Sequence, residues 1–352
     1  MKKVLVALSG GIDSSVAAYL LKKQGYSVVG ATMALTSYDK SDRKRSCCSE
    51  KDRYYARYAA AQLDIPFEII DYRELFKKEV IKPFINAYRM AQTPNPCILC
   101  NDRMKFFHLL NFAKKQGISH IATGHYANIV EYKGRKFVAK GKDSKKDQSY
   151  FLYGLDVPQI DNLLFPLGNL HKSEVRKIAD SINLITKKKP ESQEICFVDN
   201  DYRSLIYEDA KPKCGEFVDE TGNSLGEHKG IENFTVGQRK GLGISSDRPF
   251  YVKAIDSVSG DIILAGRDGI ISKSFYMTNF ILKDDREQFS AYVKIRSQSK
   301  PVKSELILLG NKIQIKSEFG FWGVTPGQSA VAYIDDRIVA GGIILPIESP
   351  VY

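Results

Sequence analysis

The stretch Ser9-Gly10-Gly11-Ile12-Asp13-Ser14-Ser15 follows a short apolar run, residues 3–8, and precedes a segment with helical spacing that begins at Val16. An apolar run of this length fits a buried parallel strand. Backbone N–H groups in a glycine-rich turn, together with the N-terminus of the next helix, bind anions. The stretch therefore predicts a strand–loop–helix phosphate site. We expect a serine hydroxyl to cap the helix and Asp13 to help hold a divalent cation.

The loop differs from two common nucleotide-binding loops. A Walker A loop needs Gly-Lys-Ser or Gly-Lys-Thr, and a Rossmann dinucleotide loop needs Gly-x-Gly-x-x-Gly. Residues 9–15 contain neither pattern. The alternative is an ordinary turn that is rich in glycine and serine. We favour a phosphate site because the whole stretch lies where open α/β sheets bind their ligands.

Strands and helices alternate over roughly the first 200 residues. Apolar runs predict strands at 3–8, 26–33, 66–71 and 118–123, and helical patterns separate them at 16–21, 51–62 and 104–116. This alternation predicts an α/β domain at 1–210, built on a doubly wound parallel sheet. After residue 210, glycines and short β-type runs recur. We therefore predict two small all-β domains, a central one at 211–270 and a C-terminal, barrel-like one at 271–352.

The composition is that of a folded chain with a basic surface. The 352 residues are 43% hydrophobic and 26% charged, which fits two or three globular domains. Lys and Arg number 52 against 41 Asp and Glu, a net charge of +11. This excess favours a polyanionic partner, although a solvated basic surface is the simple alternative. Because no apolar stretch is long enough for a membrane span or a signal peptide, we expect a cytoplasmic protein.

The cysteines are too few for a disulfide scaffold but are unevenly placed. Cys47 and Cys48 are adjacent, Cys97 and Cys100 form a C-x-x-C pair, and Cys196 and Cys214 stand alone. Reactive thiols and metal-binding thiols are both open on this spacing.

Several longer stretches, in addition to the loop, resemble the tRNA-specific 2-thiouridylases. These enzymes are ATP-dependent thiolases with a pyrophosphatase loop of the Ser-Gly-Gly-Ile-Asp-Ser kind. The loop alone is shared by several amidating and thiolating enzymes, but the combination is much more specific. The matching stretches occur in the family's order over nearly the whole chain, at residues 93–96 (TPNP), 100–101 (CN), 105–106 (KF), 123–126 (TGHY), 146–152 (KDQSYFL), 195–197 (ICF), 235–243 (TVGQRKGLG) and 325–328 (TPGQ).

The resemblance implies an activity, a substrate and two catalytic cysteines. Such an enzyme adenylates the C2 oxygen of the wobble uridine in tRNA and replaces this oxygen with persulfide sulfur. It implies Cys100 as the nucleophile and Cys196 as the persulfide carrier, with a disulfide bond formed between them. For Cys214 we expect the role of a small, buried hydrophobic side chain. The tRNA substrates implied are those for Glu, Gln and Lys, and the sulfur donor is a relay protein or a cysteine desulfurase.

The resemblance also implies the residues that bind ATP, with Mg²⁺, and tRNA. For Met33 plain core packing is an alternative, and for His125 a hydrogen-bonded structural histidine is equally open. The family usually has an aromatic residue where this chain has Ser297, which puts base stacking there in doubt. The ATP-binding residues implied are Ala7, Leu8, Ser9, Gly10, Gly11, Ile12, Asp13, Ser14, Met33 and Gly124. The tRNA-binding residues implied are Asn95, Pro96, Cys97, His125, Lys146, Asp147, Gln148, Arg296, Ser297 and Gln328.

One departure from the family pattern concerns Cys97, where many members carry an aspartate thought to transfer protons. Together with Cys100, Cys47 and Cys48 it gives four potential soft ligands, which could hold zinc or an iron–sulfur cluster. A redox relay and inert thiols are the other interpretations. We expect Cys47 or Cys48 to approach Cys97 in the fold.

Two other classes of function stay open on the sequence. An amidating synthetase of the same loop family would adenylate a small molecule, and a non-catalytic RNA-binding relative would carry a decayed nucleotide site. The basic excess and the two β domains favour RNA over a small molecule. The complete loop and both cysteines argue against decay.

Overall fold

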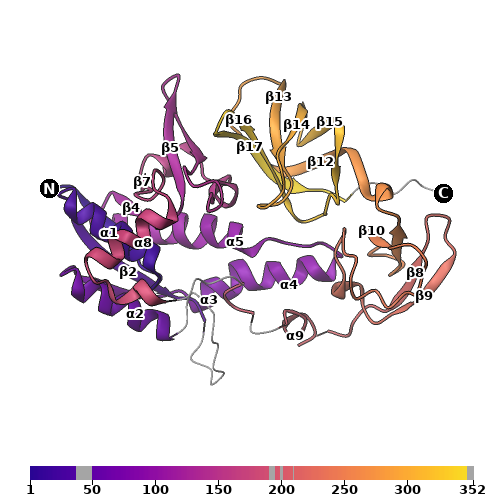
Figure 1. Cartoon of the computed structure of the whole chain (residues 1–352), viewed down its shortest axis with the longest axis horizontal. Helices are drawn as coiled ribbons and strands as arrows, with labels where there is room; N and C mark the ends of the chain where they lie inside the picture. The colour runs from indigo at the N-terminus through magenta and orange to yellow at the C-terminus, as the bar shows by residue number, and fades with distance from the viewer. Residues whose placement is uncertain (37–49, 190–194, 199–200, 209, 347–352) are drawn as a thin grey trace. The chain divides into compact units, whose positions relative to one another are not determined.

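The computed structural model describes residues 1–36, 50–189, 195–198, 201–208 and 210–346 (Figure 1). The chain forms two compact units. The first contains Met1–Ile81 and Pro96–Asn200, and the second contains Lys82–Asn95 and Asp201–Tyr352. The segment Lys82–Asn95 therefore belongs to the second unit, although the residues before and after it belong to the first.

The first unit is built on a parallel sheet of five strands in the order β3-β2-β1-β4-β7. Strand β1 lies at the centre, where Leu5 pairs with Val29 of β2 and Ile121 of β4. This order, with crossover helices, confirms the predicted doubly wound sheet. The strands are β1 (Lys3–Ala7), β2 (Ser27–Ala34), β3 (Phe67–Asp71), β4 (His120–Ala122) and β7 (Leu163–Leu164).

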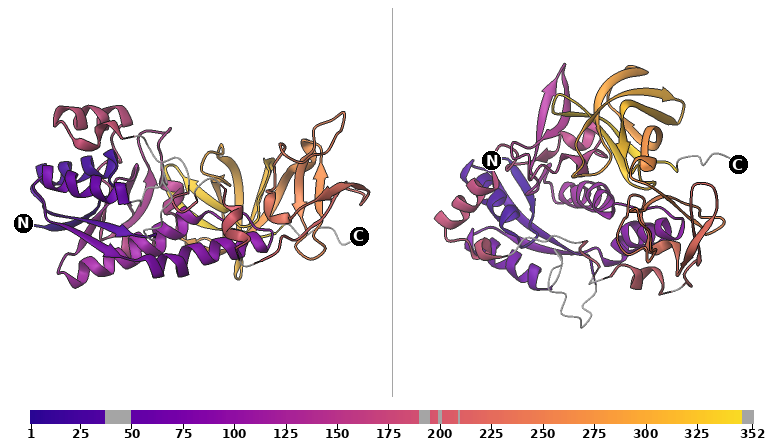
Figure 2. Two further views of the ribbon diagram at one scale, coloured as in Figure 1. Left: turned by 90° about the horizontal axis from the view of Figure 1, so that it is seen from below. Right: turned by 45° about the vertical axis from the view of Figure 1, so that its right-hand side comes forward.

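Helices pack on both faces of this sheet (Figure 2). Val4 and Val6 of β1 belong to one apolar cluster with residues of α1 (Ile12–Lys23), α2 (Glu50–Gln62) and α8 (Lys172–Ser181). The alternate residue Leu5 is fully buried but is not part of that cluster. The first unit also contains α3 (Arg73–Phe76), α5 (Pro96–Leu99), α6 (Leu110–Lys115), α7 (Val157–Ile160), the π-helices η1 (Lys77–Ile81) and η2 (Cys100–Leu109), and the 3₁₀ helices η3 (Ser149–Leu152) and η4 (Ile185–Lys188).

A hairpin that the sequence analysis did not anticipate follows strand β4. Strands β5 (Ala127–Tyr132) and β6 (Arg135–Lys140) are antiparallel, with Tyr132 opposite Arg135. The connecting Lys133 and Gly134 both have positive φ, +51° and +73°. A two-residue loop with this backbone matches the twist of the flanking strands.

The second unit begins with a four-stranded sheet in the order β10-β11-β8-β9. Phe217, Val252 and Leu264 form its core, with 3₁₀ helix η5 (Ile231–Asn233) packed beside it. Two helices from distant parts of the chain, α4 (Lys82–Arg89) and α9 (Arg203–Ile206), contact each other, and both contact η5. The strands are β8 (Gly215–Val218), β9 (Ser224–His228), β10 (Tyr251–Ile255) and β11 (Ile262–Ala265).

Six long antiparallel strands close into a barrel at the C-terminal end, after the 3₁₀ helix η6 (Asp268–Ile270). Their order is β12-β15-β14-β13-β16-β17, and β12 pairs with β17 to complete the ring. Along β13 the residues Phe289, Ala291 and Val293 are buried and their neighbours are more exposed, which is the alternation of a strand with one face in the core. The strands are β12 (Ile271–Leu282), β13 (Gln288–Lys294), β14 (Val302–Leu309), β15 (Lys312–Trp322), β16 (Ser329–Ile334) and β17 (Arg337–Ile344).

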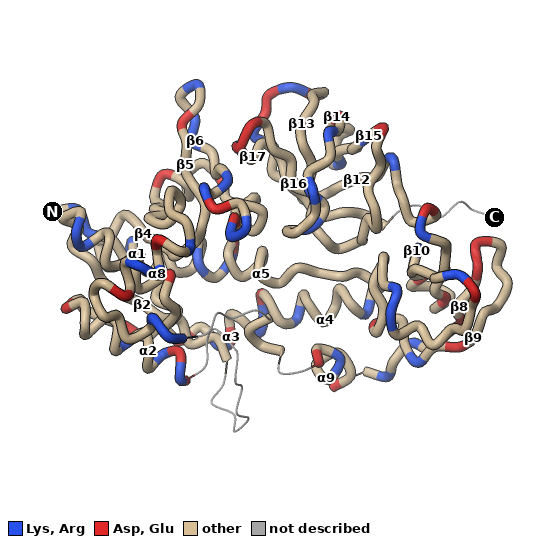
Figure 3. The backbone as a smooth tube through the Cα atoms, viewed as in Figure 1, with Lys and Arg blue, Asp and Glu red and all other residues tan. Residues whose placement is uncertain are grey.

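Most of the predicted elements of the first unit occur within a few residues of their expected bounds. The helix expected at 104–116 begins earlier, at Cys100, because η2 precedes α6 without a break. Lys and Arg are distributed over both units (Figure 3). Within the described ranges, no helix combines the length and apolar character needed to cross a membrane.

Candidate functional site: a phosphate loop and two cysteine-bearing segments

The loop after β1 is held by close backbone packing. Gly10 has φ +71°, and a Cβ there would lie 2.1 Å from the carbonyl oxygen of Asp52. Gly11 is the N-cap of α1. Because glycine has no side chain, the first N–H groups of α1 are open to an anion.

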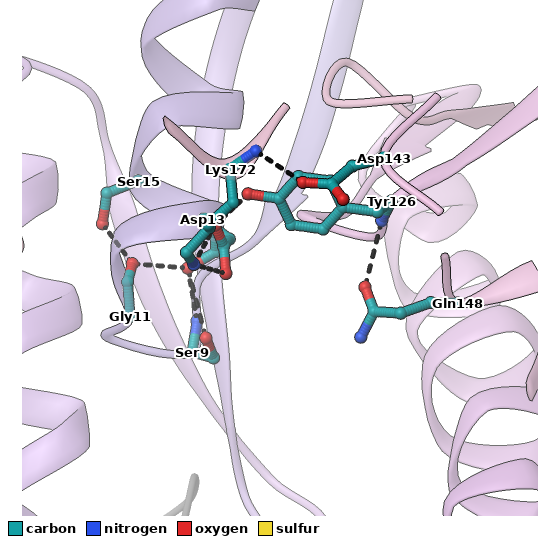
Figure 4. A network of polar contacts seen from close by, with 9 residues as sticks. Ser9, Gly11, Asp13, Ser15, Tyr126, Asp143, Gln148 and Lys172 are labelled. Atoms are coloured by element: carbon teal, nitrogen blue, oxygen red, sulfur yellow. Dashed lines mark hydrogen bonds and ion pairs between the residues drawn. The ribbon is translucent and has the colours of Figure 1, made fainter. Parts of the chain in front are cut away.

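Two serine hydroxyls stabilise the loop from within (Figure 4). Ser14 Oγ accepts a hydrogen bond from the Ser9 N–H (3.1 Å) and donates to Gly11 O (3.2 Å). Ser15 Oγ donates to the same carbonyl at 2.9 Å. The expected serine cap is therefore wrong: both hydroxyls bind a carbonyl, and a glycine occupies the N-cap. The helix N-terminus keeps its donors for a ligand.

A buried lysine holds the loop carboxylate. Lys172 Nζ contacts both carboxylate oxygens of Asp13 at 2.7 Å, and the Tyr126 hydroxyl donates to Asp13 Oδ1 at 2.7 Å. The Lys172 side chain is 9% exposed and that of Asp13 is 30% exposed. Lys172 N–H also donates to Asp143 Oδ2 at 3.0 Å. Figure 4 shows this network, which gathers groups from three separate parts of the chain.

Lys172 is not among the predicted site residues, although its position in a helix is unusual for a lysine. Lys172 is the first residue of α8, and a cation in the first turn of a helix is disfavoured by the helix dipole. A buried lysine at that position needs a carboxylate nearby. Asp13 is that carboxylate, and it comes from a loop more than 150 residues earlier.

Gly124 lies against the loop itself. A Cβ at Gly124 would be 2.7 Å from the backbone nitrogen of Ser14 and 2.8 Å from the carbonyl carbon of Asp13. A glycine at the end of a strand permits a close approach of another backbone segment. The structure shows that the approaching backbone is the start of α1, so any larger residue would displace the phosphate loop. Met33, one of the predicted ATP-binding residues, is 8% exposed at the carboxyl end of β2.

A second buried ion pair lies on the other side of the loop. Lys189 pairs with Asp52 and donates to Gly10 O at 3.1 Å, and its ammonium lies 5.1 Å from the centroid of the Tyr55 ring. The two side chains are 15% and 6% exposed. By its sequence alone, the basic run 187–189 predicts a solvated surface or a contact with phosphate. Lys189 instead binds the carbonyl of Gly10 and pairs with Asp52.

Cys97 and Cys100 lie on one continuous helical segment. Cys97 is exposed within α5, and Cys100 is half-buried as the first residue of η2. Their separation of three residues places the side chains on adjacent turns of the helix. Asn101 fixes this segment, since its Nδ2 donates to Phe151 O at 3.1 Å and its Oδ1 accepts from Lys105 Nζ at 2.8 Å.

Cys196 lies in a short turn anchored by its neighbour. Val198 N–H donates to Ile195 O at 3.1 Å. Phe197 is buried, and its ring packs edge-on against Phe76 with centroids 5.6 Å apart. Phe76 ends α3, and α3 also contacts η2, the helix that begins with Cys100. The two cysteine-bearing segments therefore pack on the same short helix.

Only two of the four potential soft ligands, Cys97 and Cys100, lie within the described residues. Among the residues that the structure describes, no group of three His, Cys, Asp or Glu side chains is placed to hold a metal ion. Cys47 and Cys48 lie outside the described residues. Their approach to Cys97, and a zinc or iron–sulfur site, remain predictions.

The candidate tRNA residues of the first unit differ in accessibility. His125 is 7% exposed, with Nδ1 2.7 Å from Thr123 Oγ1, and burial holds the pKa of its imidazole well below the usual value. A cationic contact from His125 to phosphate is therefore disfavoured. Asp147 Oδ1 accepts from Gly141 N–H and Ser149 N–H, which makes Asp147 the organiser of its turn.

Gln148, next to Asp147, contacts the backbone through its amide oxygen. Its Oε1 accepts from Tyr126 N–H at 3.0 Å. The Nε2 group points away from that contact in Figure 4. It can therefore donate to a base edge. Lys146 and Pro96 complete the predicted set in this unit; Lys146 is half-buried and Pro96 is buried.

Two candidate tRNA residues of the second unit tie its segments together. Arg296 Nη2 donates to Val236 O (2.9 Å), Gly323 O (3.2 Å) and Thr325 Oγ1 (2.6 Å). Gln328 Nε2 donates to Thr93 O at 2.8 Å. Ser297 and Asn95 are half-buried. Contacts of these residues with tRNA remain predictions, and any such contact would be added to an internal structural role.

Three family models together match most of the chain. The model described as tRNA methyl transferase HUP domain matches residues 2–200. That described as tRNA methyl transferase PRC-barrel domain matches 203–266, and that described as Aminomethyltransferase beta-barrel domain matches 272–344.

Curated relatives match over nearly their whole length. The tRNA-specific 2-thiouridylase MnmA of Clostridium beijerinckii is 42% identical, with 97% of this chain and 98% of the relative covered. The protein of the same name from Clostridium perfringens is 43% identical with the same coverage. Among solved structures, the U34-tRNA thiolase NcsA from Methanococcus maripaludis has a TM-score of 0.37 and 18% identity, covering 59% of this chain and 71% of that chain.

Removing one partner of the buried pair beside Gly10 should destabilise the protein strongly. Asp52→Asn or Lys189→Met should each lower the free energy of unfolding by about 3 kcal/mol, because each leaves a buried charge without its partner. The double variant should lose clearly less than the sum of the two. Urea denaturation of all three variants measures this. Asp71→Asn, at an ion pair whose carboxylate side chain is 58% exposed, is the matched control and should change stability little. Additive losses at positions 52 and 189 would contradict the proposed coupling.

The buried imidazole of His125 should make stability depend on pH. Its pKa is lowered in the folded state, whereas an unfolded histidine titrates near about 6.5. Below that pH the unfolded state binds more protons, so stability should fall as the pH decreases, by at most about 1.4 kcal/mol per pH unit. In His125→Asn this loss should be smaller than in the wild type. Unfolding free energies from pH 7.5 to 5 test this, with the half-exposed His171→Asn as control. Parallel curves for wild type and His125→Asn would refute the assignment.

Proposed function

Because the chain belongs to the family of tRNA-specific 2-thiouridylases, we propose that it is an ATP-dependent sulfurtransferase that makes 2-thiouridine at the wobble position of tRNA. The observation that carries the proposal is the pairing of an open phosphate loop with two cysteine-bearing segments packed on one helix, α3. An amidating synthetase would need the loop but not the two cysteines. A non-catalytic relative would need neither Asp13 nor the buried lysine that holds it.

The loop supplies the groups that hold the triphosphate of ATP. The N–H groups at the N-terminus of α1 face the phosphates, and Gly10 and Gly11 leave room for them. Asp13 is a carboxylate at the edge of this cradle, which suits Mg²⁺, and Lys172 suits a phosphate oxygen. Mg²⁺, when bound, neutralises charge on the phosphates. The Asp13–Lys172 pair keeps both groups in position and neutral as a pair before ATP arrives.

Adenylation makes the uridine oxygen a leaving group. The C2 oxygen of the uridine attacks the α-phosphorus of ATP, an O–P bond forms, and pyrophosphate leaves. The terminal sulfur of a Cys196 persulfide then attacks C2 and AMP departs. Cys100 thiolate attacks Cys196 Sγ, the S–S bond to the terminal sulfur breaks, and the thiouridine is released with a Cys100–Cys196 disulfide. A cellular dithiol reduces this disulfide, and the sulfur donor then restores the persulfide.

The remaining partners follow from the resemblance. We propose tRNAs for Glu, Gln and Lys as substrates, a relay protein or a cysteine desulfurase as sulfur donor, and the cytoplasm as location. The net charge of +11 supports a polyanionic substrate. We propose a thiol relay as the role of Cys97, which is exposed and one helical turn from Cys100.

Replacing the loop carboxylate should stop adenylation without removing tRNA binding. Asp13→Ala should abolish tRNA-dependent release of AMP and pyrophosphate, and Asp13→Asn, which keeps the hydrogen-bonding shape, should do the same if the charge is what matters. Tyr126→Phe, which removes only one hydrogen bond to Asp13, is the matched control and should retain most of the activity. Pyrophosphate released by Asp13→Asn at the wild-type rate would remove Asp13 from the proposal.

Replacing Cys196 should separate adenylation from sulfur transfer. Cys196→Ser should still adenylate tRNA, but it should transfer no sulfur because a hydroxyl cannot carry a persulfide. Labelled sulfur in tRNA and AMP formation are measured together. Cys214, which we expected to be buried, is exposed in the second unit, so the expectation is wrong. Cys214→Ser is the control and should behave like the wild type. Thiolated tRNA from the Cys196→Ser protein would exclude Cys196 as the carrier.

A further inference from the structure

The loop that joins η5 to β10 forms a hollow to which nothing above assigns a role. Its volume is about 240 Å³, and Arg239, Ser246, Arg248 and Phe250 lie along its wall. The loop contains the stretch Gly237-Gln238-Arg239-Lys240-Gly241-Leu242-Gly243. The hollow lies entirely within the second unit.

The loop is held in shape by its own backbone. Gly237 N–H donates to Val252 O (2.8 Å), and Val252 N–H donates to Gln238 O (3.0 Å). Gln238 Nε2 donates to Lys240 O at 3.0 Å. Gly241 and Gly243 have φ of +76° and +72°, a backbone that other residues rarely adopt. The hollow is therefore formed before any ligand arrives.

Two of the side chains on the wall of the hollow, Arg239 and Arg248, are cationic. Arg239, Lys240 and Arg248 are exposed, and in the described part of the chain no carboxylate pairs with their side chains. Pairing is available elsewhere in the same unit, where Lys253 Nζ contacts Glu220 Oε1 at 2.6 Å. Two guanidinium groups on the wall of one polar hollow match the geometry with which arginine binds phosphate.

An exposed aromatic side chain lies beside the start of this loop. Trp322, the single tryptophan, is 41% exposed and packs edge-on against Tyr251 with ring centroids 5.7 Å apart. A Cβ on Gly237 would lie 3.4 Å from the indole and 3.4 Å from Arg296 Nη2. Exposed aromatics next to cationic groups are typical of single-stranded nucleic-acid sites, where bases stack and phosphates are neutralised. This combination favours RNA over free phosphate or a protein.

We propose that the hollow between Arg239 and Arg248 binds a backbone phosphate of the tRNA, with the Trp322 indole as the neighbouring stacking surface. The proposal rests on tRNA as the substrate and adds to it a phosphate site that is separate from the ATP loop. The site contributes to tRNA affinity and not to the chemical steps.

The test measures tRNA binding by the full-length protein at several salt concentrations. Arg239→Gln/Arg248→Gln should lower the slope of log affinity against log salt by about two, and should weaken binding about tenfold or more at low salt. The KM for tRNA should rise, whereas kcat at saturating tRNA should stay near the wild-type value. Arg267→Gln/Lys273→Gln removes the same charge from exposed positions of the same unit and is the matched control.

Each outcome decides the proposal. An unchanged slope, or an equal loss in the control variant, would overturn it. Inorganic phosphate that binds the wild type but not the variant, without any change in tRNA affinity, would identify a free-phosphate site instead. Unchanged tRNA binding with slower persulfide delivery would assign the surface to the sulfur-donor protein. A wild type that thiolates no tRNA would refute the proposed function itself, independently of the variant.

Discussion

The backbone of the phosphate loop makes direct contact with two neighbouring segments, and the geometry of the first unit depends on this contact. Gly10 lies against the carbonyl of Asp52 at the start of α2, and Gly124 lies against Ser14 at the start of α1. Neither contact leaves space for a Cβ. The positions of α2 and of the end of β4 therefore decide where the N–H groups of the loop point.

Two ion pairs hold the loop in the position that backbone packing gives it. Two lysines from late in the sequence, Lys172 and Lys189, pair with Asp13 and Asp52 on the two sides of the loop. A buried ion pair gives modest net stability, but it strongly disfavours arrangements in which one partner is missing. The loop therefore reaches its final geometry only when the chain as far as Lys189 is in place. Lys189 is also close in sequence to Cys196, the predicted persulfide carrier.

In the second unit, hydrogen bonds from side chains to backbone carbonyls hold distant segments together. Arg296 donates hydrogen bonds to the Val236 carbonyl and to Thr325, and Gln328 donates to the Thr93 carbonyl. These bonds join the barrel to the loop before β10 and to Thr93. Arg239 and Arg248, which pair with no carboxylate of the described residues, lie instead at the hollow of that loop. A guanidinium that is already satisfied holds the fold, whereas one without a partner is available to a phosphate. This distinction separates residues of the same type that a sequence pattern treats alike.

The sequence by itself was enough to predict the alternating strands and helices of the first unit, the glycine loop, the all-β second half and the family. These features depend on the local spacing of residues and on short motifs, which can be recognised in the sequence alone. It could not show that Lys172 and Tyr126 surround Asp13, that Lys189 clamps Gly10, or that His125 is buried and neutral. It also missed the β5–β6 hairpin, whose turn, Lys133-Gly134, is short and carries a weak signal. Such facts depend on which distant side chains meet after folding, because burial and charge pairing are properties of three-dimensional neighbours and not of positions along the chain.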